Sequence, residues 1–320
     1  MVKLNILFYT DLHFPGHPEF GFTLEPSDPD EAPKGLSLLR DLILRNRHKG
    51  SEIEITLINR NVTESGDTQL GARKLTSTLL SAYDELWFFG YYQKNMPDFN
   101  PRTGGPENEL NDDEVLALRG WMAEGGVLIS GDHAVPQSPY LGLGRALGYR
   151  VPRAGQMRRW EGPPTSNQGD SFNTMSPGQV LDDLDDPNLQ DNEEPQHIHL
   201  WMDEAGSGLP HELFQCSDGI INVLPDHKHE GALVIPALTG SDWPDGSPTP
   251  FFVAWGSDNR HSFPFFNPLV SVYDGHQVSV GRIVADSTWH HYTNVNLHNL
   301  PWDPMGDKNP RVAVNLIGQY

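Results

Sequence analysis

Cysteine is nearly absent from this sequence, and its scarcity excludes whole classes of protein. Cys216 is the only cysteine among 320 residues, so the chain has no internal disulfide framework and no pair of thiolates for a structural zinc ion. Long apolar runs are missing as well, because no stretch approaches the roughly 20 apolar residues of a membrane-spanning helix. We therefore expect no contact with a membrane.

Positive charge is also scarce. The chain has 22 Lys and Arg against 43 Asp and Glu, a formal net charge of 22 − 43 = −21. A polyanion would be repelled, which excludes nucleic acid and anionic membrane surfaces as partners. The apolar run at the N-terminus is broken by Asp11 and His13 and is too short for a secretory signal. The sequence predicts a soluble, cytoplasmic protein.

What is present in the first half is an alternation of two hydrophobic patterns. Apolar runs typical of buried strands occupy 4–9, 53–58, 85–90 and 127–130, and apolar residues at helical spacing occupy 35–47, 75–80 and 111–122, with a further helix expected at 139–147. Nearly continuous apolar strands alternating with helices indicate a parallel sheet that is covered on both faces. The predicted fold class is therefore α/β, with a doubly wound, mostly parallel sheet.

The pattern fails over about 150–219, where Gly, Pro, Asn and Asp dominate and the acidic stretch 181–195 has no periodicity. We interpret this region as an irregular insertion or lid within one domain that spans 1–320. Strand patterns resume at 220–224, 232–237, 251–255, 270–273 and 280–285. They predict later strands of the same sheet together with a small antiparallel piece, and the residues after 308 resemble a closing helix.

Histidine and aspartate follow four of the predicted strands. They are Asp11, His13 and His17; Asp132 and His133; Asp226, His227, His229 and Glu230; and Asp286, His290 and His291. Because the carboxyl ends of parallel strands form the ligand crevice of such a sheet, we expect these groups to converge. They suit either a three-ligand metal site with an open position or a metal-free acid/base pair of His and Asp. Any one of these motifs taken singly is more often structural than catalytic.

Three segments resemble a known family. They are ELWFFG (85–90), ELNDDEVLALRGWMAEGGVLISGDH (109–133) and GLGRALG (142–148). Together they are similar to the class I glutamine amidotransferase-like superfamily, whose fold is flavodoxin-like, and are closer to its ThuA-like branch, which is associated with trehalose and related sugars. The amidotransferases carry a nucleophilic cysteine after this strand. Here Gly131, Asp132 and His133 stand there, so a cysteine glutaminase is excluded.

The resemblance implies functional positions as well. ThuA-like proteins carry a His after the Gly-Gly strand, a central Asp-His-Pro segment and a Gly-His near the C-terminus, and the matching residues here are His133, then Asp226 and His227, then His290. The chain departs from that pattern at Lys228, where the family has Pro, and at 287–291, where STWHH replaces Gly-His. The resemblance covers 1–148 fairly and 220–292 in patches.

Two segments inside the irregular region also carry candidate groups. Arg158 and Arg159 are suited to bind an anionic group or a sugar, although a solvated loop explains them as well. The stretch QHIHLWMD (196–203) alternates His197 and His199 on one face of an expected strand, a spacing that fits two metal ligands or a half-buried strand equally. No Walker or Rossmann motif occurs, so no nucleotide cofactor is expected.

The leading hypothesis is an enzyme that acts on a small polar, carbohydrate-derived substrate by hydrolysis or another acid/base step. Its catalytic groups would be Asp132, His133, His227, Asp286 and His290, with the two aspartates orienting the histidines; its substrate-binding groups would be His13, Arg158, Arg159, Trp289 and His291; and its ligands for zinc, iron or manganese would be His133, His227, His229 and His290. The alternative is a catalytically silent domain that binds a metabolite or a protein partner. Both hypotheses are compatible with a homo-oligomer.

Overall fold

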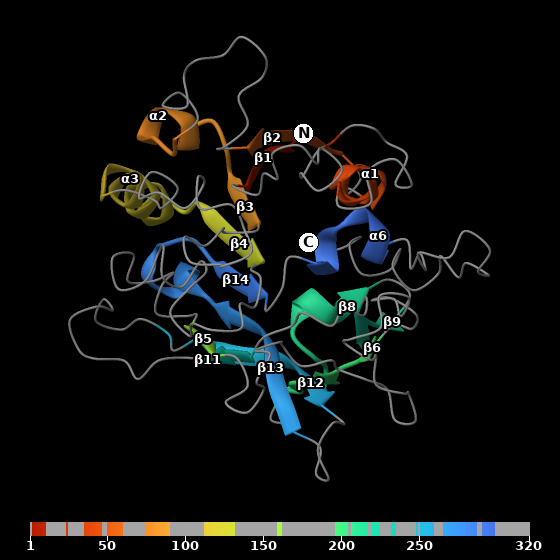
Figure 1. The fold of residues 1–320 in the computed structure, drawn as a ribbon. Coiled ribbons are helices and arrows are strands. Elements are labelled where there is room, and N and C mark those ends of the chain that lie inside the picture. The colour runs from red at the N-terminus through yellow and green to blue at the C-terminus, as the bar shows by residue number, and fades with distance from the viewer. Residues whose placement is uncertain are drawn as a thin grey trace, which may run out of the picture.

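The structure is a computed structural model, and it describes 2–10, 24, 35–46, 50–59, 74–89, 112–131, 159–161, 196–203, 206–216, 219–224, 232–234, 248, 250–258, 265–286 and 290–297. In these residues the backbone forms one sheet of eight strands, in the order β2-β1-β3-β4-β14-β13-β12-β7, and three sheets of two strands (Figure 1). The predicted helices at 139–147 and after 308 lie outside the described residues. The predicted mixture of helices and strands is confirmed.

Five neighbouring strands of the large sheet are parallel. They are β1 (Val2–Thr10), β2 (Ser51–Asn59), β3 (Glu85–Phe89), β4 (Val127–Gly131) and β14 (Ile283–Asp286). Their register aligns their carboxyl ends, because Thr10 lies opposite Phe89, Phe89 opposite Gly131, and Gly131 opposite Asp286. The last residues of four predicted strands therefore form one row across the sheet.

The other three strands of the large sheet are antiparallel. They are β13 (Phe265–Tyr273), β12 (Phe251–Asp258) and β7 (His199–Leu200). The strand β7 lies within 196–203, where the alternation in QHIHLWMD predicted a strand, and it pairs with β12 at Ala254 and Trp255. The wider insertion predicted at about 150–219 stays a prediction.

Three two-stranded sheets share no strand with the large one. They pair β5 (Arg159–Glu161) with β11 (Ala232–Val234), β6 (Gln196–His197) with β10 (Val223–Leu224), and β8 (Gln215–Cys216) with β9 (Gly219–Ile220). The single strand predicted at 220–224 is thus wrong. Its residues divide between β9 and β10, and neither strand belongs to the large sheet.

Helices cover both faces of the parallel strands. On one face, α1 (Ser37–Asn46) buries Leu39 and Leu42 against Phe8 and Trp87; on the other, α2 (Ser77–Leu80) and α3 (Asp112–Ala123) pack on the side of the sheet that carries Leu7 and Phe88. Adjacent strand residues point to opposite faces, which is why β1 and β3 supply both clusters. Figure 1 shows α1 on one side of β3 and β4, and α2 and α3 on the other.

Short helical turns complete the described part of the chain. They are the 3₁₀ helices η4 (Glu212–Phe214), η5 (Gly275–Val278) and η6 (His290–Tyr292), followed by α6 (Asn294–Leu297). The helix α6 places Leu297 in the same buried cluster as α1. None of the helices within the described ranges is long and apolar enough to cross a bilayer.

Glycines set the spacing between the starts of β4 and β14. Gly125, with φ +102°, ends α3 in a conformation that favours glycine, and the Gly281 N–H donates to the Met122 carbonyl at 2.9 Å. A Cβ on Gly281 would lie 1.7 Å from the Gly126 carbonyl oxygen, and one on Gly126 would lie 2.3 Å from the Trp121 ring. The three glycines are thus required for different reasons: Gly125 for its positive φ, Gly126 for the Trp121 ring, and Gly281 for close packing of backbone on backbone.

We predict that Gly281→Ala destabilises the protein by about 3 kcal/mol or more, because the new methyl group meets backbone that has no room to yield. Urea unfolding of the two proteins measures the difference. Gly120→Ala is the matched control, since a Cβ at this exposed position of α3 meets nothing within 4 Å and should add about 1 kcal/mol of helix stability. Equal stability of the wild type and Gly281→Ala would contradict the packing argument.

The carboxylate of Glu85 is half-buried at the start of β3. Its Oε2 accepts a hydrogen bond of 2.8 Å from the Trp87 indole N–H. Burial raises the pKa of Glu85 above the ordinary value of 4.5, against the lowering effect of that hydrogen bond. The folded protein therefore holds this proton more tightly than the unfolded chain does.

The raised pKa predicts a pH-dependent stability. The stability that Glu85 contributes is fully present below pH 4.5 and is lost as the pH rises through the raised folded-state value. Glu85→Gln keeps an oxygen acceptor for Trp87 and removes the charge. The free energy of unfolding of wild type relative to Glu85→Gln should thus fall as the pH rises from 4.5 towards neutrality in urea titrations. A constant difference over that range would contradict the prediction.

Candidate functional site

Asp286 ends β14 and is the buried acid at the row of strand ends. It is 4% exposed, and it lies opposite Gly131, the last residue of β4. The chain then turns back through η6, which brings the His291 Nδ1 to 3.0 Å from both carboxylate oxygens of Asp286. The neighbouring Tyr292 hydroxyl donates to Asp286 Oδ2 at 3.0 Å. One carboxylate thus binds an imidazole and a phenol.

This geometry determines which imidazole nitrogen carries the proton. An ionised carboxylate only accepts hydrogen bonds, so His291 Nδ1 must be the donor of the contact to Asp286. In the neutral ring, Nε2 then has the lone pair that can accept a proton. A histidine that is oriented in this way by a buried carboxylate is the arrangement that general-base catalysis needs. The pair can therefore do acid/base chemistry.

An aromatic cluster packs against the ring of Tyr292. Its ring centroid lies 5.1 Å from that of Phe89 and 6.1 Å from that of Trp87, and both neighbours come from β3. Phe8 of β1 packs on the same two rings, at 5.6 Å and 5.5 Å. The tilted and edge-on angles of these pairs are those that aromatic rings prefer. The position of the phenol is thus determined by the central strands of the sheet.

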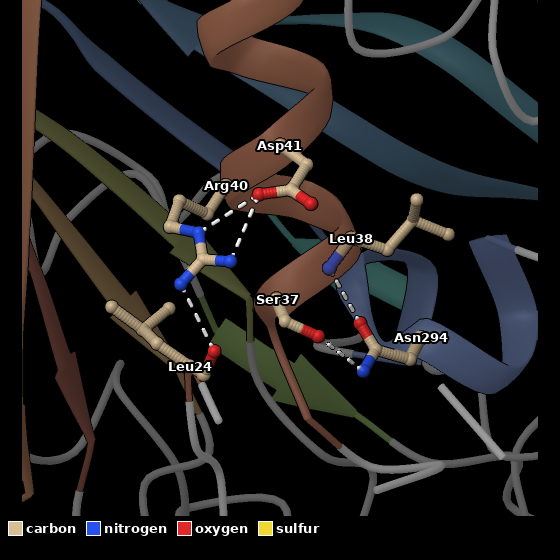
Figure 2. A network of polar contacts seen from close by, with 6 residues as sticks. All are labelled: Leu24, Ser37, Leu38, Arg40, Asp41 and Asn294. Carbon is tan, nitrogen blue, oxygen red and sulfur yellow. Dashed lines mark hydrogen bonds and ion pairs between the residues drawn. The ribbon is translucent and has the colours of Figure 1, made fainter. Parts of the chain in front are cut away.

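The turn that carries His291 is anchored to the start of α1 (Figure 2). The Asn294 Oδ1 accepts from the Leu38 N–H at 2.8 Å, its Nδ2 donates to Ser37 Oγ at 2.9 Å, and its backbone N–H donates to the Gly35 carbonyl at 2.9 Å. The first N–H groups of a helix have no partner within the helix. Asn294 therefore caps α1 from another part of the chain.

A second contact in Figure 2 ties α1 to the segment before it. Arg40 Nη1 donates to the Leu24 carbonyl at 3.0 Å, while its Nε and Nη2 both lie 2.9 Å from Asp41 Oδ1. The guanidinium thus connects the helix to Leu24 with its charge satisfied by the next residue. Through α1, this contact and Asn294 connect the segment between β1 and α1 to the segment after β14.

Two of the sequence-predicted site residues come together in the structure, in a different pairing from the expected one. Asp286 was expected to orient His290, but the imidazole that the structure places on Asp286 is that of His291, which was assigned only to substrate binding. The structure places the backbone of His290 at the start of η6. Sequence alone does not tell which residue of such a tight turn contacts the strand end.

Most of the other candidates lie outside the described residues. They are His13, His17, Asp132, His133, Arg158, Asp226, His227, His229 and Trp289, while Arg159 lies in β5. Residues 226–230 were expected at the sheet edge because they follow a predicted strand of the large sheet. That strand, β10, belongs to a separate sheet, so this reason does not hold. His197 and His199 belong to two short strands in different sheets, and His199 is exposed.

The described ranges contain no group of three or more His, Cys, Asp or Glu side chains arranged to hold a metal ion. The side chains predicted as metal ligands are not among those described, so the metal site stays a prediction. Tyr292 and Asn294 were missed by sequence reasoning. The signal for Tyr292 is its place after His290 and His291, and nothing in the sequence links Asn294 to Ser37.

Comparisons with known proteins identify no family. No family model matches the chain, and no curated protein matches it. Among solved structures, the mmIFT52 N-terminal domain is 12% identical with a TM-score of 0.47 and covers 93% of this chain and 91% of its own. The cytoplasmic proteins STM3548 and STM1381 from Salmonella typhimurium are each 11% identical, with TM-scores of 0.40 and 0.41, and cover 91% and 92% of this chain and 96% and 98% of their own. Likenesses this distant support no argument about function.

We predict that Asn294→Ala destabilises the protein by about 2–4 kcal/mol, because the buried Leu38 N–H and Ser37 hydroxyl lose their partners. Asn294→Asp is the matched variant, since it keeps the acceptor for Leu38 and places a negative charge near the start of a helix. It should cost clearly less. Thermal and urea unfolding of the three proteins measure the difference. Equal losses of stability in the two variants would contradict the capping role.

Proposed function

We propose that this protein is an enzyme that performs acid/base chemistry on a small polar substrate, with His291 as the proton-transferring group and Asp286 as the residue that orients it. The observation that supports this most directly is the approach of His291 Nδ1 to both oxygens of a buried carboxylate, each at 3.0 Å, at the carboxyl end of a parallel strand. Ligands of open α/β sheets bind at that edge.

The fold supports the same position. We infer a doubly wound, flavodoxin-like arrangement, because the parallel strands follow the order β2-β1-β3-β4-β14 and buried helices lie on both faces. A relation to the ThuA-like branch of the glutamine amidotransferase-like superfamily is part of the proposal. Its support is the Gly-Gly pair before β4 and the direct succession of Gly131, Asp132 and His133, which follows the strand that lies beside Asp286.

In the proposed mechanism, His291 Nε2 takes a proton from water or from the substrate while Asp286 stabilises the imidazolium that forms. Positioned proton transfer of this kind contributes typically about 10²–10⁴ to the rate. The step fits hydrolysis or proton abstraction beside a carbonyl group, and a carbohydrate-derived substrate is the class that the resemblance suggests. A divalent metal held by His133, His227, His229 and His290 is a further proposal, and elemental analysis of wild type and His133→Ala tests it.

We predict that His291→Ala and Asp286→Asn each lower turnover about 10²–10⁴-fold. Wild type is first assayed against lactones, esters and glycosides of simple sugars, and the variants are then compared on the substrate that is turned over. His276→Ala is the control, because it removes an exposed imidazole from η5. Full turnover in His291→Ala, or no turnover by wild type on any member of the panel, would count against the proposal.

A second candidate is a domain that binds a metabolite or protein without turnover. The observation that favours it is burial, since Asp286, His291 and Tyr292 are each 4% exposed and a satisfied polar network of this kind also stabilises a core. Calorimetric binding of a sugar derivative that is recovered unchanged would support this candidate. A cytoplasmic location and a homo-oligomer belong to both versions of the proposal.

A further inference from the structure

We propose that Tyr292 is a positioning residue, which acts through Asp286 to hold His291 in the tautomer with the proton on Nδ1. This inference rests on the proposed role of the Asp286–His291 pair. Its structural basis is the Tyr292 hydroxyl, which donates to Asp286 Oδ2 at 3.0 Å while both carboxylate oxygens lie 3.0 Å from His291 Nδ1.

The Asp286 carboxylate can rotate, and the Tyr292 hydroxyl restricts that rotation. A carboxyl group turns about the bond to its Cβ, and a single imidazole N–H does not fix that rotation, since it is satisfied by either oxygen alone. A second donor on Oδ2 restricts it further. The Tyr292 hydroxyl is such a donor, and with it in place both carboxylate oxygens lie 3.0 Å from Nδ1.

The position of the Tyr292 hydroxyl does not depend on His291. The Tyr292 ring is held between Trp87 and Phe89, with centroids 6.1 Å and 5.1 Å away, and the Trp87 indole is itself fixed by a 2.8 Å hydrogen bond to Glu85. Two residues further on, Asn294 is bound to the start of α1. Contacts with β3 and α1 therefore hold the phenol in place independently of its hydrogen bond to Asp286.

The orientation of the Asp286 carboxylate determines which tautomer of His291 is populated. A neutral imidazole that loses a well-oriented acceptor at Nδ1 gains population of the tautomer with the proton on Nε2, and that tautomer has no lone pair at Nε2 to accept a further proton. Fixing the carboxylate thus keeps the ring ready to act as a base. Tyr292 needs no contact with the substrate for this role.

The test is Tyr292→Phe, studied by NMR at one fixed pH in protein with ¹⁵N-labelled histidine. The imidazole nitrogen shifts identify the tautomer of His291, and exchange with water measures how well the Nδ1 proton is held. We expect the Nδ1–H form in wild type. In the variant we expect a measurable Nε2–H fraction and proton exchange about tenfold faster, the size of effect that one lost hydrogen bond produces.

Tyr83→Phe is the matched control, because it removes the same hydroxyl from a tyrosine that packs against the cluster on the opposite face of the sheet. It should leave both His291 signals unchanged. If Tyr292→Phe also leaves them unchanged, or if wild type carries the Nε2–H tautomer, the inference is overturned. Lower thermal stability without a change at His291 would have the same meaning, since that is the behaviour of a residue that only packs.

A second variant keeps the test decisive if Tyr292→Phe does not fold. Incorporation of 3-fluorotyrosine at position 292 keeps the ring and makes the hydroxyl a stronger donor, so exchange of the Nδ1 proton should become slower; an unchanged rate counts against the inference. Because these readouts need no substrate, they separate the two proposals. Full turnover in His291→Ala with a shifted tautomer in Tyr292→Phe would reject the enzyme and keep the positioning role.

Discussion

The three hydrogen bonds of Asn294 are the constraint on which the candidate site depends. They join the turn after β14 to the first residues of α1, where Ser37 and Asn294 are buried and Leu38 is partly buried. A helix start that has no acceptor for its N–H groups costs stability, and here the acceptor comes from the segment that carries His291. The same hydrogen bonds of Asn294 therefore stabilise the start of α1 and position the segment that carries the His291 imidazole.

The chemistry of the site follows from where the sheet ends. Asp286 is drawn into the interior because β14 pairs with β4 on one side and with β13 on the other. A buried carboxylate needs donors, and the chain supplies two of them within six residues, from His291 and Tyr292. The same requirement that makes the acid acceptable in a core also orients a histidine, which is why a structural and a catalytic interpretation share so many contacts.

Sequence patterns predicted the central strands and helices well for a physical reason. The strands β1 to β4 and the helices α1 to α3 are long enough, or apolar enough, for burial to impose a visible period. The alternation at 196–203 did not indicate that β7 joins the large sheet, and 220–224 is apolar although its two halves pair in small separate sheets. Asp286 and His291 were found because they follow a strong strand. Their pairing, and the contact of Asn294 with Ser37, depend on distances across the fold that no local pattern records.

The Leu38–Asn294 hydrogen bond has a consequence for the folding of the chain. Its two partners are separated by 256 positions along the chain, so the entropy of closing that loop must be overcome before the contact forms. Contacts of such long range raise the contact order of a chain and slow its folding. The start of α1 and the segment that carries His291 are therefore joined by a contact that no local part of the sequence can make. The geometry of the Asp286–His291 pair is tied in this way to two distant parts of the chain at once.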